Sequence, residues 1–133
     1  MNREIRFKGR SKYNGDWIRG DLQTCYGTGG KLQTYIYDRY KDIMYRVVAK
    51  TVGQYIGMWD KNSREIYEGD IVVCNGNKTG LVVVWDITSS RPNWTLVKQS
   101  EWNAKKFSYK HSIEFDMSEK YEVIGNIHDE KTQ

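Results

Sequence analysis

The sequence predicts a mainly β fold of short antiparallel strands and hairpins, with little helix. The first observation is the composition, which holds eleven Ile, ten Val and ten Tyr residues against four Leu and two Ala. β-Branched and aromatic residues favour strands, and the strongest helix formers are scarce. The second observation is that apolar and polar residues alternate with a period of two in several segments, as in strands with one buried face. The third is that short motifs rich in Asn, Asp and Gly separate these segments, as in hairpins.

In the first half of the chain, alternation and turn motifs predict a series of hairpins. Residues 3–10 alternate clearly, and the Asn14-Gly15 pair that follows suits a tight turn with positive φ. Residues 35–50 also allow a helix, but residues 43–49 alternate and include two adjacent valines, so we prefer a strand. The strands expected in this half cover residues 3–10, 17–22, 32–37, 43–49 and 52–59.

In the second half, two apolar runs predict a hairpin of buried strands at residues 71–74 and 81–85. The Gly69-Asp70 corner before the first run, together with the returning strand at residues 81–85, suggests the start of a small SH3-like barrel element. At that corner Gly69 would supply an unusual backbone angle, and Asp70 would accept backbone hydrogen bonds. The other elements expected here are a helical turn or two within 98–105, a long strand at 107–117 and a strand at 121–127.

The length of 133 residues and the mixed composition predict one domain, residues 1–133. We expect two lobes at about 1–60 and 61–128, and a frayed tail at 129–133. No apolar run approaches the ~20 residues that cross a bilayer, and the first ten residues lack the apolar core of a signal peptide, so no membrane association is expected. Cys25 and Cys74 lack metal-site spacing and are expected to be free thiols in a reducing cytoplasm.

Five sequence blocks, spread from one end of the chain to the other, are in chain order REIRFKGR, WIRGDL, TVGQYIG, DKNSREIYEGDIV and YEVIGNI. Together they resemble the YopX-like proteins of bacteriophages and prophages. The resemblance implies a phage or prophage origin and a β-rich fold. It implies no activity, because none is assigned to the family. One departure is Ser63-Arg64, where family members usually carry a glycine or similar residue after the Lys-Asn turn.

A row of basic residues along the first predicted strand is the clearest candidate binding site. Members two positions apart share the polar face of the strand, at a spacing of about 6.6 Å. Such a row would contact phosphates without sequence preference, and Tyr13 and Trp17 would stack bases. The other interpretation is that basic residues on an edge strand prevent edge-to-edge aggregation. The basic row consists of Arg6, Lys8, Arg10 and Lys12.

A catalytic interpretation would start from the acids Glu65, Glu68 and Asp70. Two of them, Glu68 and Asp70, would share a strand face, and paired carboxylates can hold Mg²⁺. No histidine stands near them in sequence, and no nucleophile–base pair can be assembled. We therefore expect no enzyme, no catalytic residues, no cofactor and no metal.

The expected function is a non-enzymatic interaction or assembly module in the cytoplasm of a bacterial host. Fifteen Tyr and Trp residues exceed what a small core can hide, and both residue types favour interfaces. Residues 1–50 hold eleven basic and five acidic residues, a net of +6, whereas residues 51–133 hold ten and twelve, a net of −2. This polarity suits a homo-oligomer. A host or phage protein is the other expected partner, and the alternative function is a nucleic-acid-binding accessory protein that uses the basic row.

Overall fold

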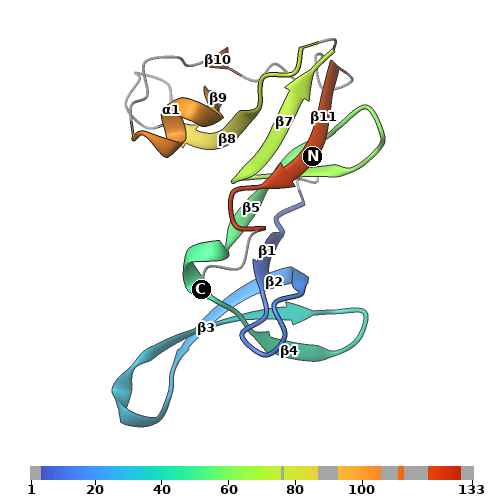
Figure 1. Cartoon of the computed structure of the whole chain (residues 1–133). Coiled ribbons are helices and arrows are strands. Elements are labelled where there is room, and N and C mark those ends of the chain that lie inside the picture. The colour runs from blue at the N-terminus through green and yellow to red at the C-terminus, as the bar shows by residue number, and fades with distance from the viewer. Residues whose placement is uncertain (1–3, 76, 87–92, 106–110, 113–119, 130–133) are drawn as a thin grey trace. The chain divides into compact units, whose positions relative to one another are not determined.

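The structure is a computed structural model of the chain, and it describes residues 4–75, 77–86, 93–105, 111–112 and 120–129. These residues are mainly β, which confirms the predicted class, and they form antiparallel sheets without a closed barrel (Figure 1). The chain divides into two compact units, Met1–Tyr55 and Ile56–Gln133. The boundary falls within strand β5 (Gly53–Trp59), so this strand contributes residues to both units.

The first unit is an antiparallel sheet with the strand order β4-β3-β2-β1, followed by the first residues of β5. A single bridge between Ser11 and Val47 also joins the end of the β1 segment to the residue after β4. The prediction of a strand instead of a helix over 43–49 is confirmed, but the strand ends at Arg46 because a 3-10 helix follows at Ala49–Thr51. The strands are β1 (Phe7–Arg10), β2 (Trp17–Tyr26), β3 (Leu32–Asp38) and β4 (Ile43–Arg46).

Strand β2 is longer than the predicted 17–22, and its extra length forms a two-stranded ribbon with β3. Residues 17–20 of β2 pair with β1, whereas residues 21–26 pair only with residues 32–37 of β3 among the described residues. β4 pairs with residues 35–38 of β3. Residues 22–34 therefore lie beyond the pairing of β1 and β4, and we call them the arm. In Figure 1 the arm is the long hairpin that ends in the turn between β2 and β3.

The second unit contains a five-stranded sheet with the order β10-β9-β8-β7-β11, and the later residues of β5 pair with β6. The predicted hairpin is confirmed, since Ile71 of β7 pairs with Val82 of β8. The described sheet is open, so the suggested SH3-like barrel is not seen in this part of the chain. The elements are β6 (Glu65–Tyr67), β7 (Asp70–Cys74), β8 (Leu81–Asp86), β9 (Asn93–Lys98), α1 (Gln99–Asn103), β10 (His111–Ser112) and β11 (Tyr121–Asn126).

In the second unit, the sequence predicted helix α1 but not strand β9. Helix α1 confirms the helical turn expected within 98–105. Strand β9 was not predicted, because its residues 95–97 are all buried and show no alternation of apolar and polar positions. The long strand predicted at 107–117 lies mostly outside the described residues, and only β10 falls within it. The unit's apolar core is formed by Ile56, Met58, Ile66, Val72, Leu81, Val83, Leu96, Tyr121 and Val123.

Candidate interaction surfaces

Lys8 and Arg10 share one face of β1, Arg6 directly precedes this strand, and each of these three members of the basic row stacks on an aromatic ring of the first unit. The Nζ of Lys8 lies 4.8 Å from the centroid of the Trp17 ring, and the Cζ of Arg10 lies 5.7 Å from the same centroid. The Cζ of Arg6 lies 5.1 Å from the centroid of the Tyr55 ring. We call these five side chains the cation–aromatic cluster. Such contacts attract the cation to the electron-rich ring face, so these residues interact within the unit.

The cation–aromatic cluster corrects two expectations about the basic row. Lys8 does not project into solvent, since only 6% of its surface is exposed. β1 is also not an edge strand, because it lies between β2 and β5. Polar contacts hold the flanking arginines: Arg6 forms an ion pair with Glu4 at 3.1 Å, and the Arg10 Nε donates a hydrogen bond to the Gly15 carbonyl oxygen at 2.9 Å. The alternation of apolar and polar residues identified the face that the basic residues share, but it did not show that Lys8 on this face is buried.

The other two residues of the predicted nucleic-acid site, Lys12 and Tyr13, lie in the turn between β1 and β2. Tyr13 is 97% exposed, and Lys12 is exposed as well. The turn confirms the Asn14-Gly15 prediction, because Gly15 has a φ of 80° and its N–H donates to the Ser11 carbonyl oxygen at 2.9 Å. The six predicted residues are thus divided between a turn that is open to solvent and a cluster that is largely used within the unit.

The arm carries an exposed apolar face that sequence reasoning missed. Leu22, Tyr26 and Leu32 lie on this face, because Leu22 and Tyr26 are four positions apart and Tyr26 pairs directly with Leu32. Their surfaces are 36%, 77% and 60% exposed, respectively. Only one of the twelve residues from 22 to 33 is charged, namely Lys31. That near absence of charge was the available sequence signal, because exposed strands usually carry charged residues.

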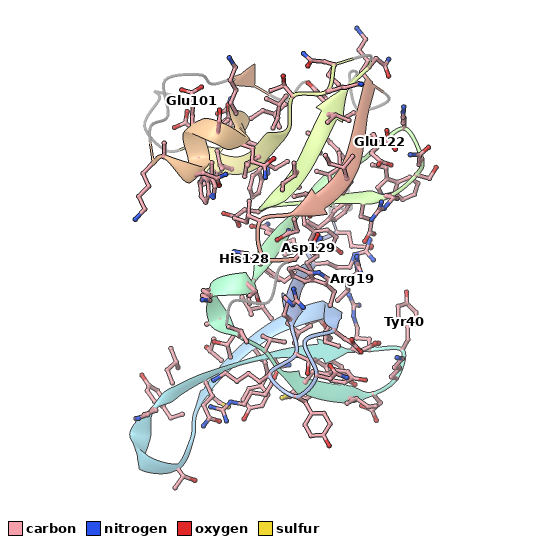
Figure 2. All side chains as sticks on the ribbon, in the orientation of Figure 1. Arg19, Tyr40, Glu101, Glu122, His128 and Asp129 are labelled. Atoms are coloured by element: carbon pink, nitrogen blue, oxygen red, sulfur yellow. The ribbon has the colours of Figure 1, made fainter. Side chains whose placement is uncertain are left out.

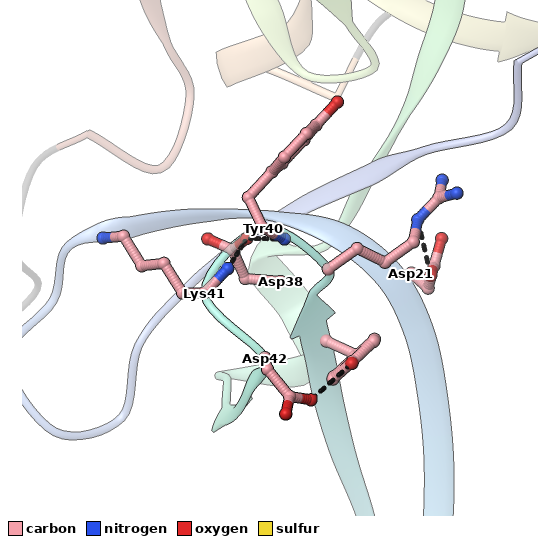
Figure 3. Close-up of polar contacts among 7 residues, drawn as sticks. Asp21, Asp38, Tyr40, Lys41 and Asp42 are labelled. Carbon is pink, nitrogen blue, oxygen red and sulfur yellow. Dashed lines mark hydrogen bonds and ion pairs between the residues drawn. The ribbon is translucent and has the colours of Figure 1, made fainter.

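The turn after β3 holds a group of polar side chains that shape the turn (Figure 3). The Asp38 Oδ1 accepts hydrogen bonds from the backbone N–H groups of Tyr40 and Lys41, at 2.9 and 3.2 Å. An aspartate that binds the backbone two and three residues onward stabilises a turn. The Tyr40 side chain is exposed, and Figure 2 shows it extending from the turn.

A short hydrogen bond closes the same turn. The hydroxyl of Tyr37 donates to the Asp42 Oδ1 at 2.5 Å. This bond to a carboxylate is the main cause that raises the pKa of the Tyr37 phenol above its ordinary value of 10.0, and desolvation and the charge of Asp42 add to it. Arg39 pairs with Asp21 at 3.2 Å between Nε and Oδ2. Asp38 and Asp42 thus hold backbone and side-chain groups of this turn in place.

In the second unit, the predicted corner at Gly69 and Asp70 is a buried hydrogen-bonded turn. Gly69 has a φ of 90°, a conformation that glycine adopts readily, and its N–H donates to the Val83 carbonyl oxygen at 2.8 Å. The buried carboxylate of Asp70 accepts from the Tyr67 N–H at 2.8 Å and from the Asn126 Nδ2 at 2.9 Å. The latter bond ties the corner to β11. Asp70 therefore stabilises the unit directly.

Asp60, at the start of the turn after β5, has the same kind of role. Its Oδ1 accepts from the backbone N–H groups of Asn62 and Arg64 at 2.9 and 2.8 Å, and its Oδ2 accepts from the Val123 N–H at 2.9 Å. Ser63 within this turn has a φ of 62°, which lies in the left-handed region that glycine adopts most readily. Among the described residues, no group of three or more His, Cys, Asp or Glu side chains is placed to hold a metal ion.

The geometry defines a mainly β protein of two compact units in which the most distinctive acidic motifs build turns. A family model described as YopX protein matches residues 6–132, so the chain belongs to the YopX family. No curated protein matches the chain. In the part of the chain that the structure describes, no helix is long and apolar enough to cross a membrane.

Proposed function

We propose that the protein is a non-enzymatic interaction or assembly module that acts in the cytoplasm of a bacterial host during phage or prophage growth. The observation that carries the proposal is the arm. A two-stranded ribbon is marginally stable by itself in water, and this one exposes three large apolar side chains on one face. Exposed apolar patches on folded proteins commonly mark sites of association. The function that we propose for the arm is to bind a partner that covers this apolar face.

The acidic residues give the proposal further support. Asp60 and Asp70 lie in the sequence block DKNSREIYEGDIV, and both accept backbone hydrogen bonds inside the second unit. The Glu65 Oε1 accepts a hydrogen bond from the Tyr67 hydroxyl at 2.8 Å. These contacts assign structural roles to groups that would otherwise be the first candidates for acid–base or metal chemistry.

Site-specific photo-crosslinking in cells tests the proposal. A photoreactive phenylalanine analogue placed at position 26 should give a covalent protein adduct, because the Tyr26 side chain would lie in the interface. The matched control is the same analogue at position 13, which replaces an even more exposed tyrosine outside the arm. Replacing Leu32 with Ser should lower the adduct yield at position 26, since Leu32 is directly opposite Tyr26. If position 26 gives no adduct above that of position 13, the proposal is wrong.

Nucleic-acid binding is the second candidate function, and one observation favours it. The Lys12 N–H donates to the Arg46 carbonyl oxygen at 2.9 Å, so two exposed cations lie on neighbouring segments, and the exposed Tyr13 directly follows Lys12 in the chain. Cations next to an aromatic ring suit a single-stranded nucleic acid. The support is weaker than for the arm, because Lys8, a central member of the basic row, is buried over Trp17.

Fluorescence anisotropy with labelled single-stranded DNA, duplex DNA and RNA, at low and at physiological salt, tests this second function. Binding through Lys12 and Arg46 should fall steeply with added salt, and Lys12→Glu with Arg46→Glu should weaken it on every sequence. Reversal of two exposed charges elsewhere in the first unit, Lys41→Glu with Lys50→Glu, is the control. Absence of binding at low salt would rule out this function.

A further inference from the structure

We infer that the free edge of β2 in the arm binds a second copy of this chain, and that the two β2 strands pair antiparallel about a two-fold axis at Thr24. The inference rests on the proposed function and names its partner. It would join the two arms into one four-stranded sheet with the order β3-β2-β2-β3.

The direction of the backbone groups follows from two hydrogen bonds of the first unit. The Gly27 N–H donates to the Lys31 carbonyl oxygen at 2.8 Å, so it points across the hairpin toward β3. The Val47 N–H donates to the Thr34 carbonyl oxygen at 3.0 Å, so Thr34 points away from β2. In an antiparallel ladder the direction alternates from residue to residue. The N–H and C=O groups of Leu22, Thr24 and Tyr26 therefore point to the edge of β2 opposite β3.

No described strand lies along that edge of the arm, since β1 pairs only with residues 17–20 of β2. Natural proteins protect such edges with charges, proline, bulges or a covering segment. The stretch from Leu22 to Tyr26, LQTCY, contains no charged residue and no proline, and its five residues have exposed side chains. A free edge with this composition is a ready template for another strand. We therefore expect a strand to cover it in the assembled protein.

The stretch is complementary to itself, which favours a second copy over other partners. In an antiparallel pairing centred on Thr24, Leu22 of each copy faces Tyr26 of the other, and the two Thr24 residues face each other. Aromatic–aliphatic and Thr–Thr pairs are favourable across strands. The absence of charge from 22 to 26 removes like-charge repulsion between identical segments. A nucleic acid or an acidic peptide would instead require cations on this stretch.

The pairing also sets which residues exchange hydrogen bonds. The Leu22–Tyr26 and Thr24–Thr24 pairs would each exchange both N–H···O bonds, because these groups point to the edge. Gln23 of one copy would face Cys25 of the other as a pair without hydrogen bonds, with a Cα–Cα separation of about 4.5 Å. This separation lies within the range that a disulfide can bridge. Cys25 thus provides one of the two thiols of a disulfide that would report the register of the two strands.

Mixing two single-cysteine proteins tests the register directly. One full-length protein carries the substitution C74S, so that Cys25 is its only cysteine. The other carries Q23C, C25S and C74S, so that its only thiol is at position 23. Mild oxidation of the mixture should give a disulfide-linked dimer that joins positions 23 and 25, at a yield at least about fivefold that of either protein alone, since same-residue pairs lie out of register by two positions at about 7–8 Å. Equal yields in all three samples would overturn the register.

Proline at position 24 tests the hydrogen bonds of the same contact. Thr24→Pro removes an N–H that points to the edge and leaves the β2–β3 ladder intact, so the dimer dissociation constant should rise about tenfold or more while the far-ultraviolet circular dichroism stays unchanged. Thr24→Val keeps the N–H and is the matched control. Sedimentation velocity over a concentration series measures both. A dissociation constant that Thr24→Pro leaves unchanged would overturn the inference.

The state of the unmodified protein separates the inference from the function on which it rests. A protein that sediments as a monomer at every concentration overturns pairing with a second copy. In that case, an adduct at position 26 with a different protein still supports the interaction module. A monomer that also forms no adduct at position 26 overturns both.

Discussion

The Lys8 ammonium nitrogen lies 4.8 Å from the centroid of the Trp17 ring, and the lysine side chain is buried. The two residues lie on adjacent strands, because Trp17 pairs with Arg10, two positions along β1 from Lys8. Lys8 thereby changes from a candidate phosphate ligand into a contributor to the stability of the first unit. The remaining exposed cations near the turn, not the centre of the basic row, are the ones available to an anionic partner.

Replacement of Lys8 with Met tests this role of the lysine. Methionine keeps an unbranched apolar stem and removes the ammonium, so the free energy of unfolding should fall by about 0.5–2 kcal/mol with the loss of the cation–π contact. Urea denaturation followed by circular dichroism measures the change. Lys12→Met at the exposed turn is the control and should stay within about 0.5 kcal/mol of the unmodified protein. Equal effects of the two substitutions would argue against a stabilising Lys8–Trp17 contact.

Replacement of Asp60 with Ala should destabilise the second unit. The substitution removes the acceptor for three backbone N–H groups, and the Val123 N–H among them is part of a buried hydrogen bond. A buried donor left without an acceptor costs about 1–3 kcal/mol, which sets the expected decrease in the free energy of unfolding. Urea denaturation measures it, with the exposed Asn62→Ala in the same turn as control. No difference between the two variants would show that Asp60 does not stabilise this turn.

Replacement of Gly20 with Ala should disturb the base of the arm. A Cβ at this position would lie 2.0 Å from the Tyr37 carbonyl oxygen, so β2 and β3 would have to separate. Overpacking of this kind typically costs about 1–3 kcal/mol. Thermal unfolding measures the loss. Gly29→Ala is the control, because its Cβ meets nothing within 4 Å while its φ of 84° adds strain without a clash. An equal loss in both variants would point to backbone strain alone.

Replacement of Tyr37 with Phe should lower stability in a manner that depends on pH. The hydrogen bond to Asp42 raises the pKa of the folded-state phenol above 10.0, so the folded state holds this proton more tightly than the unfolded state. The contribution is therefore fully present below about pH 10 and is lost as the pH rises through the raised pKa. The urea midpoints of the two proteins should differ at pH 8 and converge at higher alkaline pH.

The matched variant for this pH dependence is Asp42→Ala, which removes the acceptor of the same bond. It should show the same convergence with the unmodified protein. A difference in midpoint that stays constant from pH 8 into the alkaline range would contradict the assignment.

Local patterns in the sequence were sufficient for features that depend on neighbouring residues. The alternation along β1 gave the shared face of Arg6, Lys8 and Arg10, and Asn14-Gly15 gave the turn that follows. These features follow from the period of a strand and the φ angles of a turn, which short segments determine. The alternation could not reveal that Trp17 covers Lys8, because the ring belongs to the next strand.

Features that depend on distant residues could not be predicted in the same way. Residues 23–26 have no apolar alternation of their own, and they extend β2 because β3 supplies their hydrogen-bond partners. The acceptor role of Asp60 toward Val123 joins residues 63 positions apart. The apolar face of the arm was missed for a related reason, because its Leu32 and Tyr26 meet only when the hairpin forms.

The hydrogen bonds that Asp60 and Asp70 accept from β11 have a consequence for the order of events during synthesis. The strands β1 to β4 and the start of β5 are complete once residue 55 has left the ribosome, so the first unit has its strand partners early. The acceptors in the middle of the chain must wait for Val123 and Asn126. At about 5–20 residues per second, the intervening ~70 residues take roughly 4–14 s to be made. A nascent second unit therefore spends seconds in which two carboxylates lack their donors from β11 and one edge of β7 lacks its partner strand, which makes this interval the one in which a chaperone would act on the chain.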